Sequence, residues 1–197
     1  MSLELIIGLK NKELNQKGVQ IGIISSAKES KGVQIGILGN AAEEASYGVQ
    51  IGAVNIAKEL GGVQIGIVNG VEESSYGVQI GILGNVAKQS RGIQVGMING
   101  VYNSKWIQIG GYNIADEEES RGIQIGAVNI ADKESNGVQV GGGNISLENF
   151  IGMQLGLICY AKNGNYLQIG ALTIRGIGPW YSRITPGIGF HKEKTKY

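Results

Sequence analysis

The sequence predicts an all-β protein built as a single β-solenoid, or β-helix, of about 12–13 coils with a 14–16-residue repeat. The motif Gly-Val-Gln-Ile-Gly recurs through nearly all of the 197 residues, and successive glutamines lie 14–16 residues apart. Within each copy, apolar and polar residues alternate with the period of two that is typical of a strand. The polar segments between copies are five to eight residues long, which is too short for independent helices.

The repeat begins with a degenerate copy and ends in a segment of different composition. Leu5-Ile6-Ile7-Gly8 lies one period before the first clear copy, with Ile6 in the glutamine position, and a looser copy follows at Gly187-Ile188-Gly189-Phe190. We therefore expect a repeat domain over residues 1–174 and a C-terminal cap and tail over residues 175–197. A solenoid needs such a cap because its terminal coil exposes strand edges and apolar core.

An up-and-down β-barrel or a meander is the alternative fold, since it also repeats a short strand and a polar loop. The narrow range of coil lengths favours the solenoid, because membrane barrels usually alternate short turns with long loops. Most copies also place an asparagine after the strand segment. Stacked in register, these side chains either form an amide ladder or serve as left-handed corner residues, and both interpretations stay open. They are Asn40, Asn55, Asn69, Asn85, Asn99, Asn113, Asn129 and Asn144.

Composition argues against several functional classes. The 17 basic and 16 acidic residues give a net charge of +1, so the basic surface of a nucleic-acid-binding protein is missing. No apolar run is long enough for a transmembrane helix, and no signal peptide is visible at the start. The only histidine, His191, lies in the tail, and Cys159 takes the asparagine position of its copy. We therefore expect a protein that is not an enzyme and that has no cofactor and no metal site.

The outward row of the predicted strands is the candidate interaction face. If Val and Ile point into the core, the glutamines and their flanking glycines point outward as a flat strip along the solenoid. Such a strip either docks a protein, a second copy or a carbohydrate polymer, or it only stacks its amides on one another. The inverse orientation, with Val and Ile toward lipid, belongs to an outer-membrane barrel. The candidate face is Gln20, Gln34, Gln50, Gln64, Gln79, Gln94, Gln108, Gln124, Gln139, Gln154 and Gln168.

The repeat unit Gly-Val-Gln-Ile-Gly-Ile-Val-Asn at residues 62–69 resembles the Gly-Leu-Gln-Ile-Gly-Leu-Xaa-Asn units of bacterial surface repeat-containing proteins, best known from spirochaetes. The resemblance covers roughly residues 4–174. It implies a cell-surface or secreted protein without catalytic activity and carries no ligand residues over. We expect a structural or interaction module of adhesin-like type that self-associates through its Gln/Gly face. The alternatives are a small outer-membrane β-barrel and, third, a carbohydrate-active or other enzyme on a β-helix.

Overall fold

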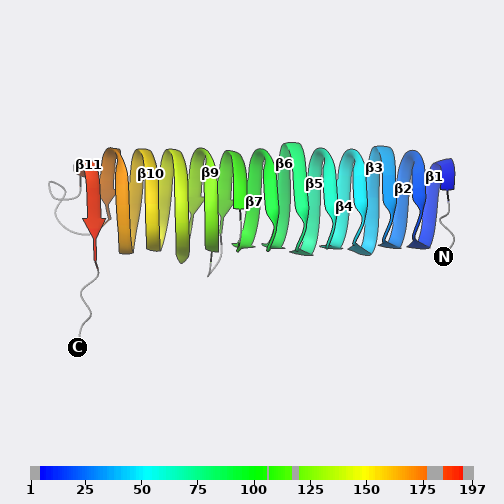
Figure 1. Cartoon of the computed structure of the whole chain (residues 1–197), viewed down its shortest axis with the longest axis horizontal. Coiled ribbons are helices and arrows are strands. Elements are labelled where there is room, and N and C mark those ends of the chain that lie inside the picture. Colours follow the sequence, from blue (N-terminus) through cyan, green and yellow to red (C-terminus); the bar gives the residue numbers. More distant parts are fainter. Residues whose placement is uncertain (1–4, 106, 117–119, 177–183, 193–197) are drawn as a thin grey trace, which may run out of the picture. The chain divides into compact units, whose positions relative to one another are not determined.

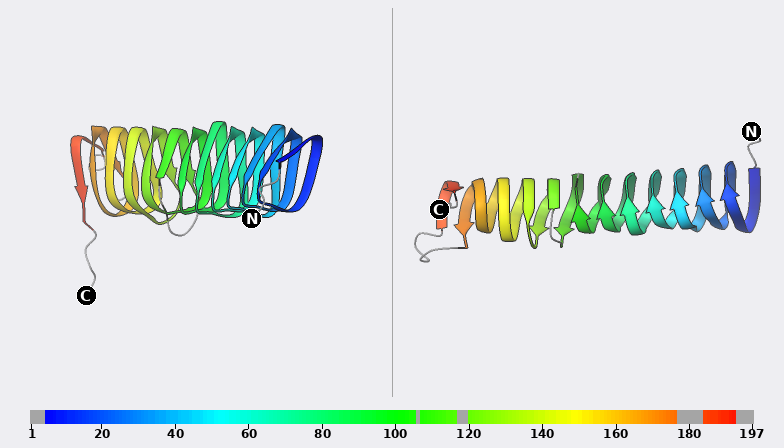
Figure 2. Two further views of the ribbon diagram at one scale, coloured as in Figure 1. Left: turned by 45° about the vertical axis from the view of Figure 1, so that its right-hand side comes forward. Right: turned by 90° about the horizontal axis from the view of Figure 1, so that it is seen from below.

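The computed structural model describes residues 5–105, 107–116, 120–176 and 184–192, and it confirms an all-β chain folded as a β-solenoid. The chain divides into two compact units, Met1–Gly100 and Val101–Tyr197. Within each unit the coils follow one another in chain order, as Figures 1 and 2 show. The part of the chain that the structure describes holds no helix long and apolar enough to cross a membrane.

The strands of the first unit pair in parallel and in register. Each repeat position therefore stacks on the same position of the next coil, as in Val49↔Val63, Gln50↔Gln64 and Ile51↔Ile65. The alternative fold, a barrel or meander, requires antiparallel pairs, so parallel pairing from β1 to β6 contradicts it. The strands are β1 (Leu5–Gln16), β2 (Val19–Ser30), β3 (Val33–Ser46), β4 (Val49–Leu60), β5 (Val63–Ser75), β6 (Val78–Ser90) and β7 (Ile93–Ser104), which ends just inside the second unit.

The second unit continues the parallel pattern and closes with one antiparallel strand. Its strands are β8 (Ile107–Ala115), β9 (Ser120–Ala131), β10 (Ser135–Arg175) and β11 (Ile184–His191). β8 pairs with β9, and β9 with β10, in parallel, but β11 pairs antiparallel with β10. The looser copy at Gly187–Phe190 is therefore not a thirteenth parallel coil: it covers the edge of the coil that contains Gln168. Residues 177–183 and 193–197 of the expected cap and tail lie outside the described residues.

The interior of the coils is lined mainly by glutamine, asparagine, serine and alanine and the exterior by larger aliphatic side chains, which reverses the orientation that we expected. Gln50, Asn55 and Ala57 of β4 are fully buried, whereas Ile51 and Ile56 between them are exposed. A coil of about 15 residues encloses little space, so two facing rows of isoleucine would not fit inside it. Small side chains and flat amides do fit, and each amide finds a hydrogen-bonding partner one coil away, about 4.8 Å along the stack.

Two glycine positions of the repeat allow the coils to stack. A Cβ on Gly62 would overlap the carbonyl oxygen of Gly48, the same corner one coil earlier, and Val63 N donates to that oxygen at 2.9 Å. A Cβ on Gly66, the second position, would overlap the backbone oxygen of Gly52 one coil earlier and would lie 2.7 Å from Asn55 Nδ2. Both glycines therefore permit the close approach of consecutive coils, and the second also leaves room for the buried asparagines.

Candidate functional site

The predicted interaction face is wrong, because its glutamines are in the core. All eleven are at most 8% exposed, and the six of the first unit form a continuous amide ladder. Gln34 Nε2 donates to Gln20 Oε1 at 3.0 Å, and Gln50 Nε2 donates to Gln34 Oε1 at 2.9 Å. The same link joins Gln139 to Gln124 in the second unit, at 2.8 Å. No glutamine of this column is available to a partner, and the amide-stacking alternative describes what the structure has.

Gln20, the first glutamine of the first unit, and Gln168, the last glutamine of the second unit, each keep one polar atom without a partner among the described residues. Gln20 Nε2 has no acceptor, because Ile6 pairs with Gln20 in the preceding coil and carries no amide. Gln168 Oε1 has no donor, because the strand that follows brings Gly189 opposite Gln168. Each unpaired atom is thus explained by the residue that ends the repeat.

The asparagines form a second ladder whose links run in the opposite direction. Asn40 Nδ2 donates forward to Asn55 Oδ1, and Asn55 Nδ2 donates forward to Asn69 Oδ1, both at 2.8 Å. Asn55 Nδ2 also donates to the backbone oxygen of Ile65 at 2.9 Å, which fixes the amide orientation because a carbonyl can only accept. No described residue other than glycine has a positive φ, so the left-handed corner interpretation is wrong. The ladder interpretation is confirmed.

Cys159 takes the place of an asparagine in this ladder, as its sequence position indicates. Asn144 Nδ2 donates to Cys159 Sγ at 3.7 Å, and the thiol is fully buried and free. Burial raises the pKa of the Cys159 thiol, and the hydrogen bond from Asn144 lowers it by less. A buried thiol held in its neutral form is a poor nucleophile.

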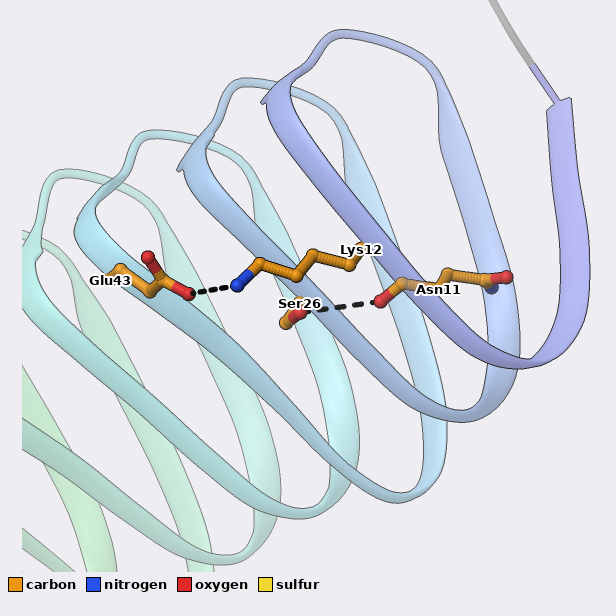
Figure 3. Close-up of polar contacts among 4 residues, drawn as sticks. All are labelled: Asn11, Lys12, Ser26 and Glu43. Carbon is orange, nitrogen blue, oxygen red and sulfur yellow. Dashed lines mark hydrogen bonds and ion pairs between the residues drawn. The ribbon is translucent and has the colours of Figure 1, made fainter.

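Charged side chains gather along one edge of the first unit and pair with each other there. Lys12 Nζ lies 3.4 Å from Glu43 Oε1, while Ser26 Oγ donates to the backbone oxygen of Asn11 at 3.3 Å (Figure 3). Lys28 and Glu44 lie 3.1 Å apart. These side chains are about half exposed or more, and the described residues include no group of three or more His, Cys, Asp or Glu side chains that could hold a metal ion.

The most prominent surface of the first unit is aliphatic. We call it the aliphatic face: two columns of outward side chains, one from the residue after each core glutamine and one from the residue two positions later. Between the columns runs a trough of about 400 Å³ with a floor of Gly36, Gly52 and Gly66. The face consists of Ile21, Ile35, Ile51, Ile65, Ile80 and Val95 in the first column, and Ile23, Ile37, Ala53, Ile67, Ile82 and Met97 in the second.

Sequence reasoning missed this face because alternation alone does not say which row points inward. One signal in the sequence favours the observed orientation. The row of Gln, Gly, Asn and Ala is made of small or flat side chains, and only such a row fits inside a coil of about 15 residues. Comparison of the chain with family models, with curated proteins and with solved structures finds no match in any of the three.

Proposed function

We propose that the protein is a non-catalytic structural module that docks through the aliphatic face of its first unit. The observation that carries this proposal is the orientation of the coil. The glutamine and asparagine side chains are buried inside and bonded to one another, and the unit presents a periodic sheet of branched aliphatic side chains to the outside. Exposed apolar patches of this extent mark interaction sites more often than they mark an idle surface.

The polar groups of the protein support a structural role over catalysis. The buried amides of both ladders are committed to each other, and the described ion pairs lie on an exposed edge instead of in a cleft. An enzyme active site needs convergent acid, base or nucleophilic groups, and Cys159 is held as a neutral thiol inside the coil.

Carbene footprinting of the protein in the cells that produce it tests the docking proposal. If the face is docked, the segment that contains Ile65 and Ile67 should be labelled several-fold less than expected from the exposure of these side chains in the undocked protein. The charged edge at Lys58 serves as the internal reference. Equal labelling of both segments would contradict a docking role.

A matched pair of variants makes the footprint specific. Ile67→Lys, on the aliphatic face, should restore labelling of its neighbours, because a lysine placed in a dry contact leaves an unpaired charge. Val86→Lys, at a position that is 59% exposed and outside the face, should leave the protection in place. The same behaviour in both variants would argue against a defined surface.

The resemblance of the repeat to surface repeat proteins supports a position at the cell surface or outside the cell. Protease treatment of intact cells checks this placement. A surface protein should lose its epitope under treatment, while a cytoplasmic marker in the same cells stays intact. Retention of the epitope until the cells are lysed would contradict the placement and leave the docking role to be judged by the footprint.

A further inference from the structure

We infer that the partner of the aliphatic face is a second copy of this chain, and that the two copies interlock at the trough beside Ala53. The inference rests on the proposed docking function and names its partner. It starts from three properties of the face: its period, its lack of polar groups and a single gap in one of its columns.

The period selects a partner of the same construction. Because the coils pair in parallel and in register, each column of the face repeats its side chains about every 4.8 Å. A row of side chains can enter the trough along its whole length only if it has the same spacing. A second copy has that spacing at every coil, and interdigitated columns of this kind pack as a dry zipper.

The chemistry of the face also fits a second copy. None of its twelve positions carries a charged or polar side chain. The ion pairs Lys28–Glu44 and Lys58–Glu73 lie at the charged edge and involve no residue of the face. The face itself therefore offers no charge with which to select an anionic lipid surface or an oppositely charged protein. With roughly 50–70 Å² of apolar area for each partly exposed side chain, the face offers on the order of 700 Å². A stable interface uses about 800 Å² from each partner.

A gap in the second column supplies the register. Ala53 stands between Ile37 and Ile67, and the alanine opens the wall of the trough at this coil. Ile37 and Ile82 are the most exposed side chains of the face, at 74% and 72%. In a two-fold dimer an isoleucine of each copy enters the Ala53 gap of the other, so the contact is made twice and the assembly closes.

Sedimentation equilibrium of the full chain over a wide concentration range tests the inference. Wild type should form a dimer, and Ile67→Lys should raise the dissociation constant at least about tenfold, since a lysine would be buried in an aliphatic contact. Val86→Lys adds the same charge outside the face and should dimerise as wild type does. Circular dichroism of both variants verifies that the solenoid is intact. A wild type that stays monomeric, or equal effects of the two lysines, would overturn the inference.

Ala53→Ile tests the gap, because an interlocked dimer and a non-specific apolar contact predict opposite changes in the dissociation constant. It adds apolar area but fills the gap, so interlocked copies should dissociate at least about tenfold more readily. Tighter association would show a non-specific apolar contact and would overturn the interlocked dimer. The footprint separates this result from the docking role. A monomeric protein whose face is protected in cells keeps the docking function but has another partner, and flotation of that monomer with phosphatidylcholine vesicles would identify the partner as lipid.

Discussion

The coils of the two units follow the same repeat pattern but differ in the outward residue that follows the second glycine of the repeat. In the first unit this residue is mostly a branched aliphatic, such as Ile37, Ile67 and Ile82, and it forms one wall of the trough. In the second unit the same position carries Gly111, Ala127, Gly142, Leu157 and Ala171. Because the interior positions are nearly the same in both, the comparison shows that the outer position varies freely without changing the coil.

The interiors of the units differ at the last coils of the second one. Phe150 takes the position of a buried serine, and Tyr166 takes the position of a corner glycine; their rings lie 6.3 Å apart. Gly164, which lies between them in sequence, leaves the space that the large Phe150 needs, since a Cβ on Gly164 would overlap the backbone of Phe150. The first unit thus depends on amide ladders over its length, whereas the second adds an aromatic cluster where the solenoid ends.

The largest effect is expected from a corner glycine. Gly62→Ala should destabilise the chain by more than about 4 kcal/mol or prevent folding of the first unit, because a Cβ there would collide with the backbone of Gly48. Gly137→Ala should cost at least as much in the second unit, where φ is also +152°. Guanidinium denaturation measures both. Gly70→Ala is the control: a Cβ there meets no atom within 4 Å, so a cost similar to that of Gly62→Ala would contradict the stacking argument.

Breaking the glutamine ladder should cost more in the first unit than in the second. Gln64→Leu leaves Gln50 Oε1 without its donor and Gln79 Nε2 without its acceptor, for about 2–4 kcal/mol. Gln154→Leu should lower the free energy of unfolding by about 1–2 kcal/mol less than Gln64→Leu does, because the hydroxyl of Ser146 still donates to Gln139 Oε1. Urea denaturation of the two variants gives the difference, and equal costs would show that the ladder links do not act locally.

Tyr166 should make the second unit sensitive to alkaline pH. Burial raises the pKa of Tyr166 to about 12, against a partial lowering by Arg175, while the unfolded phenol titrates near 10. The folded unit keeps the neutral phenol, so stability is constant below pH 10 and falls by about 2–3 kcal/mol as the pH rises to 12.

Denaturation at several alkaline pH values, compared between wild type and Tyr166→Phe, isolates this contribution. The phenylalanine variant should lose about 1 kcal/mol at neutral pH, with the hydrogen bond to the Ala161 oxygen, but should lack the extra alkaline loss. Tyr76→Phe, at an exposed position of the first unit, should follow the wild-type curve. If Tyr166→Phe also follows it, the phenol is not the titrating group.

The smallest effect is a gain. Cys159→Asn should lengthen the asparagine ladder by one link, because Asn144 Nδ2 already points to this position and the backbone oxygen of Ile169 lies within reach of Sγ at 3.9 Å. We expect stabilisation of about 0.5–1 kcal/mol. Thermal unfolding measures the change, with Cys159→Ser as the control of similar size that lacks the amide. A loss in the asparagine variant would show that the coil has tightened around the sulfur.

The solenoid and its repeat length could be predicted from the sequence, because the stacking of Gln64 on Gln50 follows from a period that stays within 14–16 residues. The asparagine ladder could be predicted only as one of two interpretations, because a recurring asparagine stacks on its neighbours in either case. The orientation of the strand could not be predicted by the usual rule that aliphatic side chains go inside, since Ile51 and Gln50 alternate equally well in either direction. The space inside the coil decides between them, and that space depends on how sharply the chain turns at glycines such as Gly62, which is a property of the stack.

Opposed amide ladders also bear on how such a gene can change in length. Within the first unit each glutamine from Gln34 to Gln94 donates its Nε2 to the Oε1 of the glutamine one coil earlier, and the unpaired Nε2 of Gln20 belongs to the first glutamine of that series. A tandem duplication or deletion of one period, when it falls within a run of regular coils, therefore removes or adds whole links without creating a new mismatch. The number of repeats can thus change with little effect on the stability of the remaining coils. Recombination within the gene can therefore lengthen or shorten the protein while every coil keeps its register.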